Sequence, residues 1–154
     1  MSEKALDTLV DLVNFRIAAT GKKPETDKDG NINYVESALF DRKDVERAIS
    51  LSLAAFNMAV FPTYLKIEDE ENMMQLSDLL VTYASYLLLV RQSLLEKGRE
   101  YTIQDNGVGW TPPLLADFVY NVARELHENW WRAVTELKGS GGFDSDFVQE
   151  PDEE

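Results

Sequence analysis

The chain has 154 residues and 44% of them are hydrophobic, a length and composition that predict one folded domain with its own core. It contains no cysteine and a single histidine, His127, which excludes disulfides, cysteine-based metal centres and a multi-histidine metal site within one chain. The formal net charge of −13 argues against nucleic-acid binding, because that binding requires basic side chains to displace phosphate counterions.

The N-terminus has neither the basic region nor the apolar run of a secretory signal, so we expect none. The most apolar run, residues 79–90, has the length of a buried core helix, and we expect no membrane span and no membrane partner. The acidic surface has two readings: it keeps the protein soluble, or it forms a wall past which DNA moves without binding, since like charges repel.

The first half of the chain predicts two helices separated by a loop. An amphipathic helix spans residues 3–19 and ends at Gly21. Residues 20–35 are polar and predict a loop that can project from the core and can contain one short strand at Ile32 and Tyr34. A second helix begins after Asp41 and ends before Pro62. Its core face combines residues at helical spacing: Val45, Ala48, Ile49, Ser52, Leu53, Phe56 and Val60.

The third predicted helix is the most apolar and runs from about residue 70 to Lys97. The acidic run at residues 68–71 lies at its first turn, where the helix dipole favours negative charge. Apolar side chains cover most of its circumference, so it is expected to be the central helix, packed by the second and fourth helices. A further stripe on it contacts either the first helix or another subunit, and comprises Leu79, Tyr86 and Leu89.

Residues 98–113, Gly-Arg-Glu-Tyr-Thr-Ile-Gln-Asp-Asn-Gly-Val-Gly-Trp-Thr-Pro-Pro, are the clearest strand-like stretch. Apolar and polar residues alternate around Ile103 and Trp110, and the pair Asn106-Gly107 between them is a strong signal for a tight hairpin turn. A short hairpin is marginal alone, so we expect it to contact the helices or another chain. A fourth helix follows, from about Pro112 to Lys138.

The order of these elements resembles a pattern in structural proteins of tailed bacteriophages. A long apolar helix precedes Gly-Arg-Glu-Tyr-Thr-Ile-Gln-Asp-Asn-Gly-Val, and Thr-Pro-Pro then opens an amphipathic helix that ends in Leu137-Lys138. The resemblance covers roughly residues 41–139 and is to small helical proteins of the neck, known as adaptors, connectors or ring proteins. It implies a non-enzymatic ring subunit, without cofactors, between the portal and the tail.

The expected fold is therefore a mainly α domain over residues 1–138, with four helices and a short β-hairpin between helices 3 and 4. The expected partners are copies of the chain itself and portal or tail proteins, with DNA passing through the ring without specific binding. The expected location is the virion, and the host cytoplasm during assembly. Two alternatives remain open: another virion component, such as a tail terminator or a capsid-associated protein, or a small acidic regulatory protein that binds a folded partner.

The C-terminal arm, residues 139–154, joins the helical domain through Gly139-Ser-Gly-Gly142, which predicts a flexible linker. Beyond it, Phe143, Phe147 and Val148 lie among acidic residues, a pattern that favours a docking arm with apolar anchors over a solvated tail. Trp131 is a further candidate contact residue. It lies about 100° from Trp130 around the helix, so one of the two must leave the middle of the core stripe. The candidate partner-binding residues are Phe143, Phe147, Val148, Trp131, Asn106, Gly107 and Trp110.

Three short stretches match the beginning of a motif for ATP, calcium or zinc binding, but the other residues that each motif requires are missing. The run Asp105-Asn-Gly-Val-Gly109 matches the Asp-x-Gly-x-Gly box of the gyrase and Hsp90 ATPase fold, yet the helix before it lacks that fold's magnesium-binding residues. The run beginning at Asp27 starts like an EF-hand loop but has Ile32 in place of its glycine. His127-Glu128 starts a zinc-protease motif whose second histidine position is Trp131, and we expect His127 on the polar side of its helix.

Overall fold

The chain folds mainly into helices, which confirms the predicted class. The computed structural model describes residues 3–17, 20–26, 28, 30, 32–99, 103–105, 108–110 and 115–140. These residues form five helices: α1 (Glu3–Arg16), α2 (Arg42–Met58), α3 (Glu70–Gln75), α4 (Ser77–Arg99) and α5 (Leu115–Gly139). They also form four strands: β1 (Thr20–Thr26), β2 (Ile32–Ala38), β3 (Ile103–Asp105) and β4 (Val108–Trp110).

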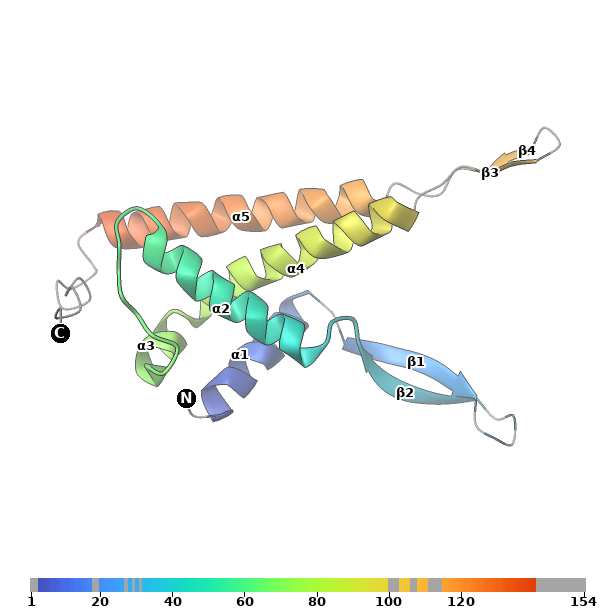
Figure 1. Cartoon of the computed structure of the whole chain (residues 1–154), viewed down its shortest axis with the longest axis horizontal. Coiled ribbons are helices and arrows are strands. Elements are labelled where there is room, and N and C mark those ends of the chain that lie inside the picture. Colours follow the sequence, from blue (N-terminus) through green and yellow to red (C-terminus); the bar gives the residue numbers. More distant parts are fainter. Residues whose placement is uncertain are drawn as a thin grey trace, which may run out of the picture.

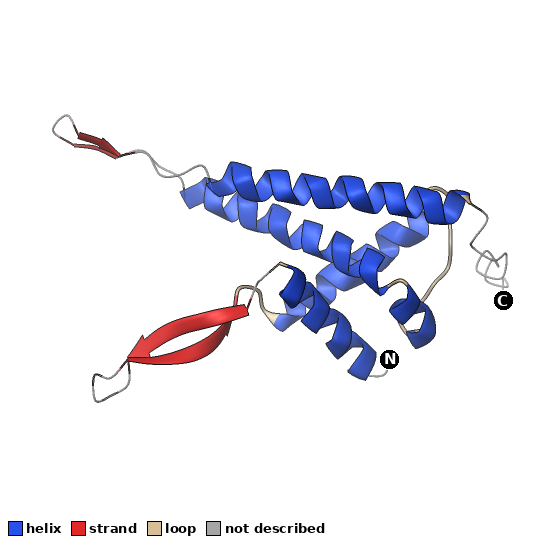
Figure 2. Cartoon of the chain, turned by 180° about the vertical axis from the view of Figure 1, so that it is seen from behind, coloured by secondary structure: helices blue, strands red, loops and turns tan. Residues whose placement is uncertain are grey.

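Helix α4 is the central helix, as its apolar circumference predicts. It contacts α5 along its length, and α2 and α1 pack against other parts of it (Figure 1). Viewed from behind, α1 and α2 lie together beside the first part of α4, while the rest of the α4–α5 pair extends beyond them (Figure 2). Of the further stripe of α4, Tyr86 packs against α5, where its ring centroid lies 4.8 Å from that of His127. The α4 residues that line the contact with α1 are others, among them Asp78 and Val81.

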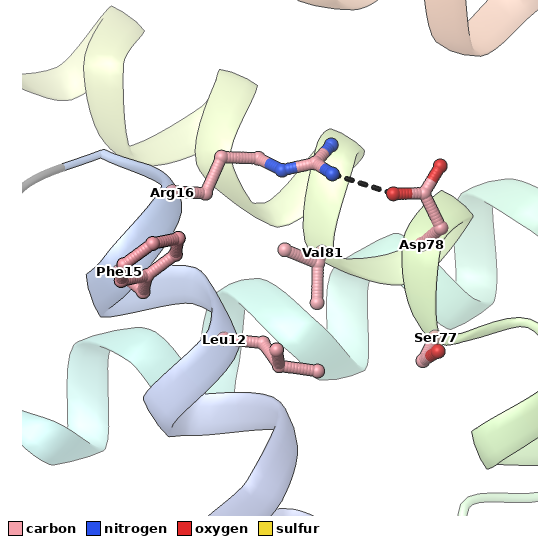
Figure 3. A pocket seen from close by; sticks show the side chains of 6 residues that line it. All are labelled: Leu12, Phe15, Arg16, Ser77, Asp78 and Val81. Carbon is pink, nitrogen blue, oxygen red and sulfur yellow. Dashed lines mark hydrogen bonds and ion pairs between the residues drawn. The ribbon is translucent and has the colours of Figure 1, made fainter.

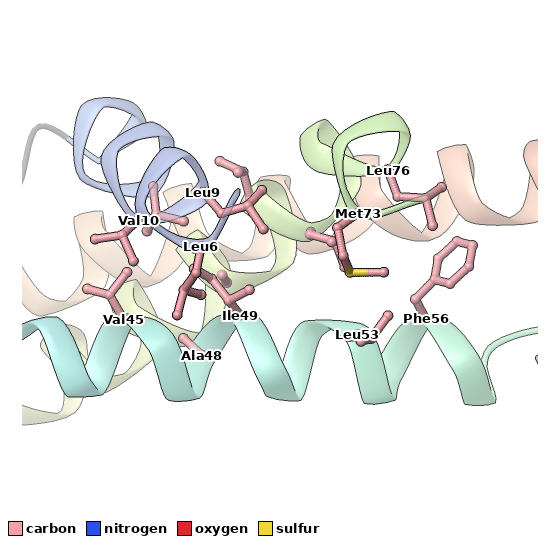
Figure 4. Packing of buried hydrophobic residues seen from close by; sticks show 14 of the residues in the cluster. Leu6, Leu9, Val10, Val45, Ala48, Ile49, Leu53, Phe56, Met73 and Leu76 are labelled. Atoms are coloured by element: carbon pink, nitrogen blue, oxygen red, sulfur yellow. The ribbon is translucent and has the colours of Figure 1, made fainter. Parts of the chain in front are cut away.

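The core lies where α1, α2, α3 and α4 meet (Figure 4). The predicted face of α2 is buried, and Val45, Ile49 and Phe56 are fully enclosed. The buried Ser52 hydroxyl donates a hydrogen bond of 2.9 Å to the carbonyl oxygen of Leu80. A polar group from α2 is thus satisfied by the backbone of α4, as burial requires.

The third predicted helix is in fact two helices, and this corrects the count of four. The short α3 ends at Gln75, and α4 begins at Ser77 after Leu76. Both Met73 and Leu76 are buried in the core.

The end of α2 differs from the prediction. Val60 is not part of the core face; it is 49% exposed and adopts a left-handed backbone conformation, with φ of 63°. The conformation is strained for a β-branched residue, and it turns the chain before Pro62. Asn57 holds the loop that follows, because its side chain donates to the carbonyl of Leu65 at 2.8 Å and accepts from the hydroxyl of Thr63 at 2.9 Å.

A two-stranded antiparallel hairpin occupies much of the region predicted as a loop. β1 pairs with β2 over a continuous register from Thr20 opposite Ala38 to Thr26 opposite Ile32. The hairpin projects from the helical body, as the prediction allowed for this region (Figure 1). Charged residues and Pro24 interrupt any apolar alternation along β1, so the periodicity that normally identifies a strand is missing.

β3 and β4 are three residues each and pair antiparallel, with Ile103 opposite Trp110. Asn106 and Gly107 between them lie outside the described residues, so the tight turn assigned to them stays a prediction. The first helix is also shorter than expected and ends at Arg16.

Candidate assembly surfaces

Helix α5 is covered mainly by α4, its principal contact partner among the described elements. Its buried residues follow one stripe: Ala116, Ala123, Trp130, Val134 and Lys138. Exposed apolar side chains lie outside this stripe: Trp131 is at its edge, and Phe118, two residues from Ala116, is on the opposite face of the helix. Apolar surface that the neighbouring helices leave uncovered is typical of a subunit that packs against another chain.

The outer end of the α4–α5 pair carries exposed apolar side chains. Leu94 is 69% exposed on α4, and Phe118 is 66% exposed on α5. Leu95 and Leu115 are also exposed there. An ion pair of 3.8 Å between Lys97 and Asp117 joins the two helices at this end. We call this set, Leu94, Leu95, Leu115 and Phe118, the outer apolar patch.

A second surface is an open hollow between α2 and α5, with α4 beneath it. Its volume is about 490 Å³. Met58, which is 82% exposed, lies on the α2 side, and Trp131, which is 50% exposed, lies on the α5 side. Apart from His127, the lining is apolar or aromatic. The α2–α5 hollow is lined by Ala55, Met58, Ala59, Val60, Tyr83, His127, Trp130 and Trp131.

An aromatic cluster forms the α4 and α5 sides of the α2–α5 hollow. The ring centroids of Tyr83 and Trp130 are 4.4 Å apart, and those of Tyr86 and His127 are 4.8 Å apart. His127 is thus partly buried among rings, which corrects its predicted place on the polar side of the helix. Burial, with a smaller contribution from Tyr86, raises the pKa of the Tyr83 hydroxyl, so that hydroxyl stays protonated at neutral pH.

The sequence predicted that Trp130 and Trp131 could not both occupy the core stripe, and this is confirmed. Trp130 is 3% exposed, whereas Trp131 is half exposed at the edge of the hollow. The indole Nε1–H of Trp130 is buried and has no hydrogen-bond acceptor among the described residues. Buried donors usually have a partner, so this one is an exception at the wall of the hollow.

Lys138 is the functional feature that the sequence reasoning missed. Its ammonium is buried and donates to the carbonyl oxygens of Phe56 at 2.5 Å, Ala59 at 2.9 Å and Phe61 at 2.9 Å. It also lies 4.5 Å from the ring centroid of Phe56. A cation at these carbonyls caps the C-terminus of α2, where the helix dipole is negative.

The environment of Lys138 contains no carboxylate among the described residues. Burial therefore lowers the pKa of its ammonium to about 8, which still leaves it largely charged at neutral pH. The signal was present in the sequence, because Lys138 follows Trp130 and Val134 at steps of four along the buried stripe of α5. A lysine on an apolar stripe at a helix end suggests a buried cap, but its acceptors are too distant in sequence to be foreseen.

A third surface lies between α1 and α4. Its volume is about 440 Å³, and the exposed ring of Phe15 lies beside Leu12 and Val81 (Figure 3). Arg16 forms an ion pair of 2.5 Å with Asp78 across it and also hydrogen-bonds the hydroxyl of Thr82. These contacts satisfy the guanidinium within the chain and attach the end of α1 to α4, while Phe15 stays 84% exposed.

The predicted contact residues are distributed over separate parts of the molecule. Trp131 lies in the wall of the α2–α5 hollow, and Trp110 lies in β4. Asn106 and Gly107 lie outside the described residues, as do Phe143, Phe147 and Val148 of the C-terminal arm.

Comparison with known protein families, characterised proteins and solved structures gives no match. Within the described residues, no cluster of three or more histidine or acidic side chains could hold a metal ion. No helix in the described part of the chain is both long enough and apolar enough to cross a membrane.

Proposed function

We propose that this chain is a non-enzymatic structural subunit of a phage particle, which forms a homo-oligomeric ring joining portal to tail. The observation that carries the proposal is the outer apolar patch. Leu94 and Phe118 are large apolar side chains that are each about two-thirds exposed, on a helix pair that extends beyond the rest of the body. Exposed apolar surface of this kind is stabilised by contact with another subunit.

In this proposal the ring forms when the α4–α5 pair of one subunit packs against the next. The two chain extensions supply further contacts: a hairpin at β3 and β4, closed by a turn at Asn106-Gly107, and the C-terminal arm, anchored by Phe143 and Phe147. Trp110 and Val148 add apolar surface to these extensions. The net charge of −13 suits a lumen through which DNA passes, because like charge disfavours adhesion.

Two related roles are distinguished by the partner. A tail terminator or capsid-associated protein would use the same self-association at another position in the virion. A small acidic regulatory protein would instead use the α2–α5 hollow to bind one folded partner, and would remain a monomer when pure. The aromatic lining of the hollow favours this second candidate function, because aromatic side chains are frequent at sites of protein contact.

Negative-stain electron microscopy of the purified chain tests the proposal. We expect closed rings of one size with a central opening, located in the neck when the chain is placed in a virion map. Particles of monomer size at every concentration, including in the presence of the portal protein, would contradict a ring subunit. Rings that attach only to tail tubes or capsid shells would favour the other virion components.

A further inference from the structure

We propose that, in the free subunit, residues 143–148 of the C-terminal arm occupy the α2–α5 hollow of their own chain. The occupant is argued from where the arm begins, from its apolar residues and from the charge near the hollow. This inference goes beyond the proposed function and does not depend on ring formation, because it concerns a contact within one subunit.

The C-terminal arm begins close to the α2–α5 hollow. Lys138, near the end of α5, donates to the carbonyl of Ala59, which lines the hollow, at 2.9 Å. The start of the arm is therefore within one lysine side chain of the hollow's rim. Residues 140 to 143 can span up to about 10 Å when extended, and one helical turn from residue 143 to residue 147 adds about 6 Å. Since Trp131 lies about 14 Å back along the helix from Ser140, Phe147 can reach it after a reversal at the glycine linker.

The second argument is the match of shape and chemistry. Phe143 and Phe147 are four residues apart, so on one helical turn they share a face, and Val148 flanks that face. Apolar anchors at this spacing are the usual ligands of a hydrophobic groove. The hollow presents the mobile, polarizable side chain of Met58 and the ring of Trp131, which together can adapt to two phenylalanine rings.

The third argument is charge. Lys138 holds a buried positive charge without a carboxylate among the described residues, and Arg132, next to Trp131, is exposed. The arm has acidic residues on both sides of its anchors, including Asp144 and Asp146. Arg132 offers these acids an exposed cationic partner, although Glu128 and Glu136 lie on the same part of α5. The seated arm also brings hydrogen-bond acceptors near the unpaired Nε1–H of Trp130.

The consequence is a latch. While the arm covers the hollow, its phenylalanines are withheld from other subunits, and the exposed ring of Trp131 is shielded. An adjoining component that binds the arm more tightly than the hollow does would release it. Release would then expose Met58 and Trp131 at the moment of assembly, so that the arm and the hollow become available together.

Tryptophan fluorescence tests the latch directly. Trp110→Phe leaves Trp130 and Trp131 as the only tryptophans, and the full chain is compared with a chain that ends at Ser140. We expect truncation to shift the emission to longer wavelength and to increase quenching by acrylamide. A synthetic peptide of residues 141–154 should restore the original signal, and the same peptide with Phe143→Ala and Phe147→Ala should not.

Variants within the full chain give an independent test. Met58→Glu in the hollow should repel the acidic arm and reproduce the spectrum of the truncated chain, whereas Met74→Glu, at an exposed methionine on α3, should leave the spectrum unchanged. Circular dichroism should report the same helical content for both variants. Equal spectra and quenching for the full and truncated chains would overturn the proposal, and so would an equal effect of the two glutamate substitutions.

Dilution separates the chain's own arm from that of a neighbour. Shielding that persists unchanged in a sample shown by mass photometry to be monomeric supports the latch, even if the chain never forms rings. Shielding that disappears on dilution together with the oligomers would overturn the latch and assign the hollow to the arm of another copy. Ring formation by a chain whose hollow stays unshielded would retain the proposed function and reject this inference.

Discussion

The two ends of helix α4 differ in how far their apolar residues are covered. At its beginning, Leu80 and Val81 are buried among α1, α2 and α3. At its other end, Leu94 and Leu95 are exposed, and α5 is the neighbouring helix there. The residue types are alike, but among the described elements only the first group packs against several helices. The comparison indicates that the first end stabilises the fold and that the second end is available for contact with another molecule.

The largest expected difference in the free energy of unfolding is between alanine substitutions of two phenylalanines, one buried in the core and one in the outer apolar patch. Phe56→Ala removes a fully buried ring and should lower the free energy of unfolding by about 3–5 kcal/mol. Phe118→Ala removes an exposed ring and should change it by less than about 0.5 kcal/mol. Urea unfolding monitored by circular dichroism, at concentrations where the chain is monomeric, measures both. Equal losses would remove the distinction between the two ends.

Lys138 should give the next largest effect, because it connects the end of α5 to the end of α2. Lys138→Met preserves most of the apolar stem but removes the ammonium donor from the carbonyls of Phe56, Ala59 and Phe61. The carbonyls of Phe56 and Ala59 keep backbone N–H donors. We expect a loss of about 1–3 kcal/mol in the free energy of unfolding. Lys43→Met, at an exposed position of α2, is the matched control and should have little effect. A similar result for both lysines would show that the buried cap contributes nothing.

Lys138 also predicts a pH dependence of defined sign. Its pKa is about 8 in the folded chain and 10.5 at its ordinary value, so between these pH values the unfolded state binds more protons. The free energy of unfolding should therefore gain a contribution as pH rises from 8 to 10.5, and lose it as pH falls back through 8. The stability of the parent chain relative to Lys138→Met should increase over this range in urea titrations. A constant or decreasing difference would contradict the lowered pKa.

The proposed turn at Asn106-Gly107 should have a smaller and local effect. Gly107→Val should cost on the order of 1 kcal/mol in hairpin stability, because a β-branched residue resists positive φ. Hydrogen exchange of the β3 and β4 amides, together with the extent of assembly, measures this. Gly98→Ala, at a position where an added side chain meets nothing within 4 Å, serves as the control. If Gly107→Val left both hydrogen exchange and assembly unchanged, the assignment of a tight turn to Asn106-Gly107 would be wrong.

Local periodicity explains which parts of this fold the sequence could predict. The buried face of α2, from Val45 to Phe56, and the separation of Trp130 from Trp131 both follow from helical spacing, and both are observed. The break at Leu76 was missed because the apolar stripe continues across it without a glycine or proline. The short strand expected at Ile32 and Tyr34 lies within β2, but β1 was missed because its residues show no apolar alternation.

The candidate site was predictable only at single residues. Trp131 was identified as an edge residue, but the hollow beside it also needs Met58 and Val60 from α2 and Tyr83 from α4. The cap formed by Lys138 joins residues about eighty positions apart, such as Phe56 and Lys138. Helical spacing predicts which residues of one helix share a face. It does not predict which other helix, distant in the sequence, packs against that face.

The most direct test of the account is native mass spectrometry of the parent chain beside Leu94→Ser/Phe118→Ser. The account predicts one closed high-order oligomer for the parent chain and a monomer of unchanged helicity for the double variant, since both substitutions lie in the outer apolar patch. Leu51→Ser/Met74→Ser, at exposed positions of α2 and α3, should assemble like the parent. A parent chain that stays monomeric, or a double variant that still assembles fully, would contradict the assignment of the outer apolar patch to subunit contact.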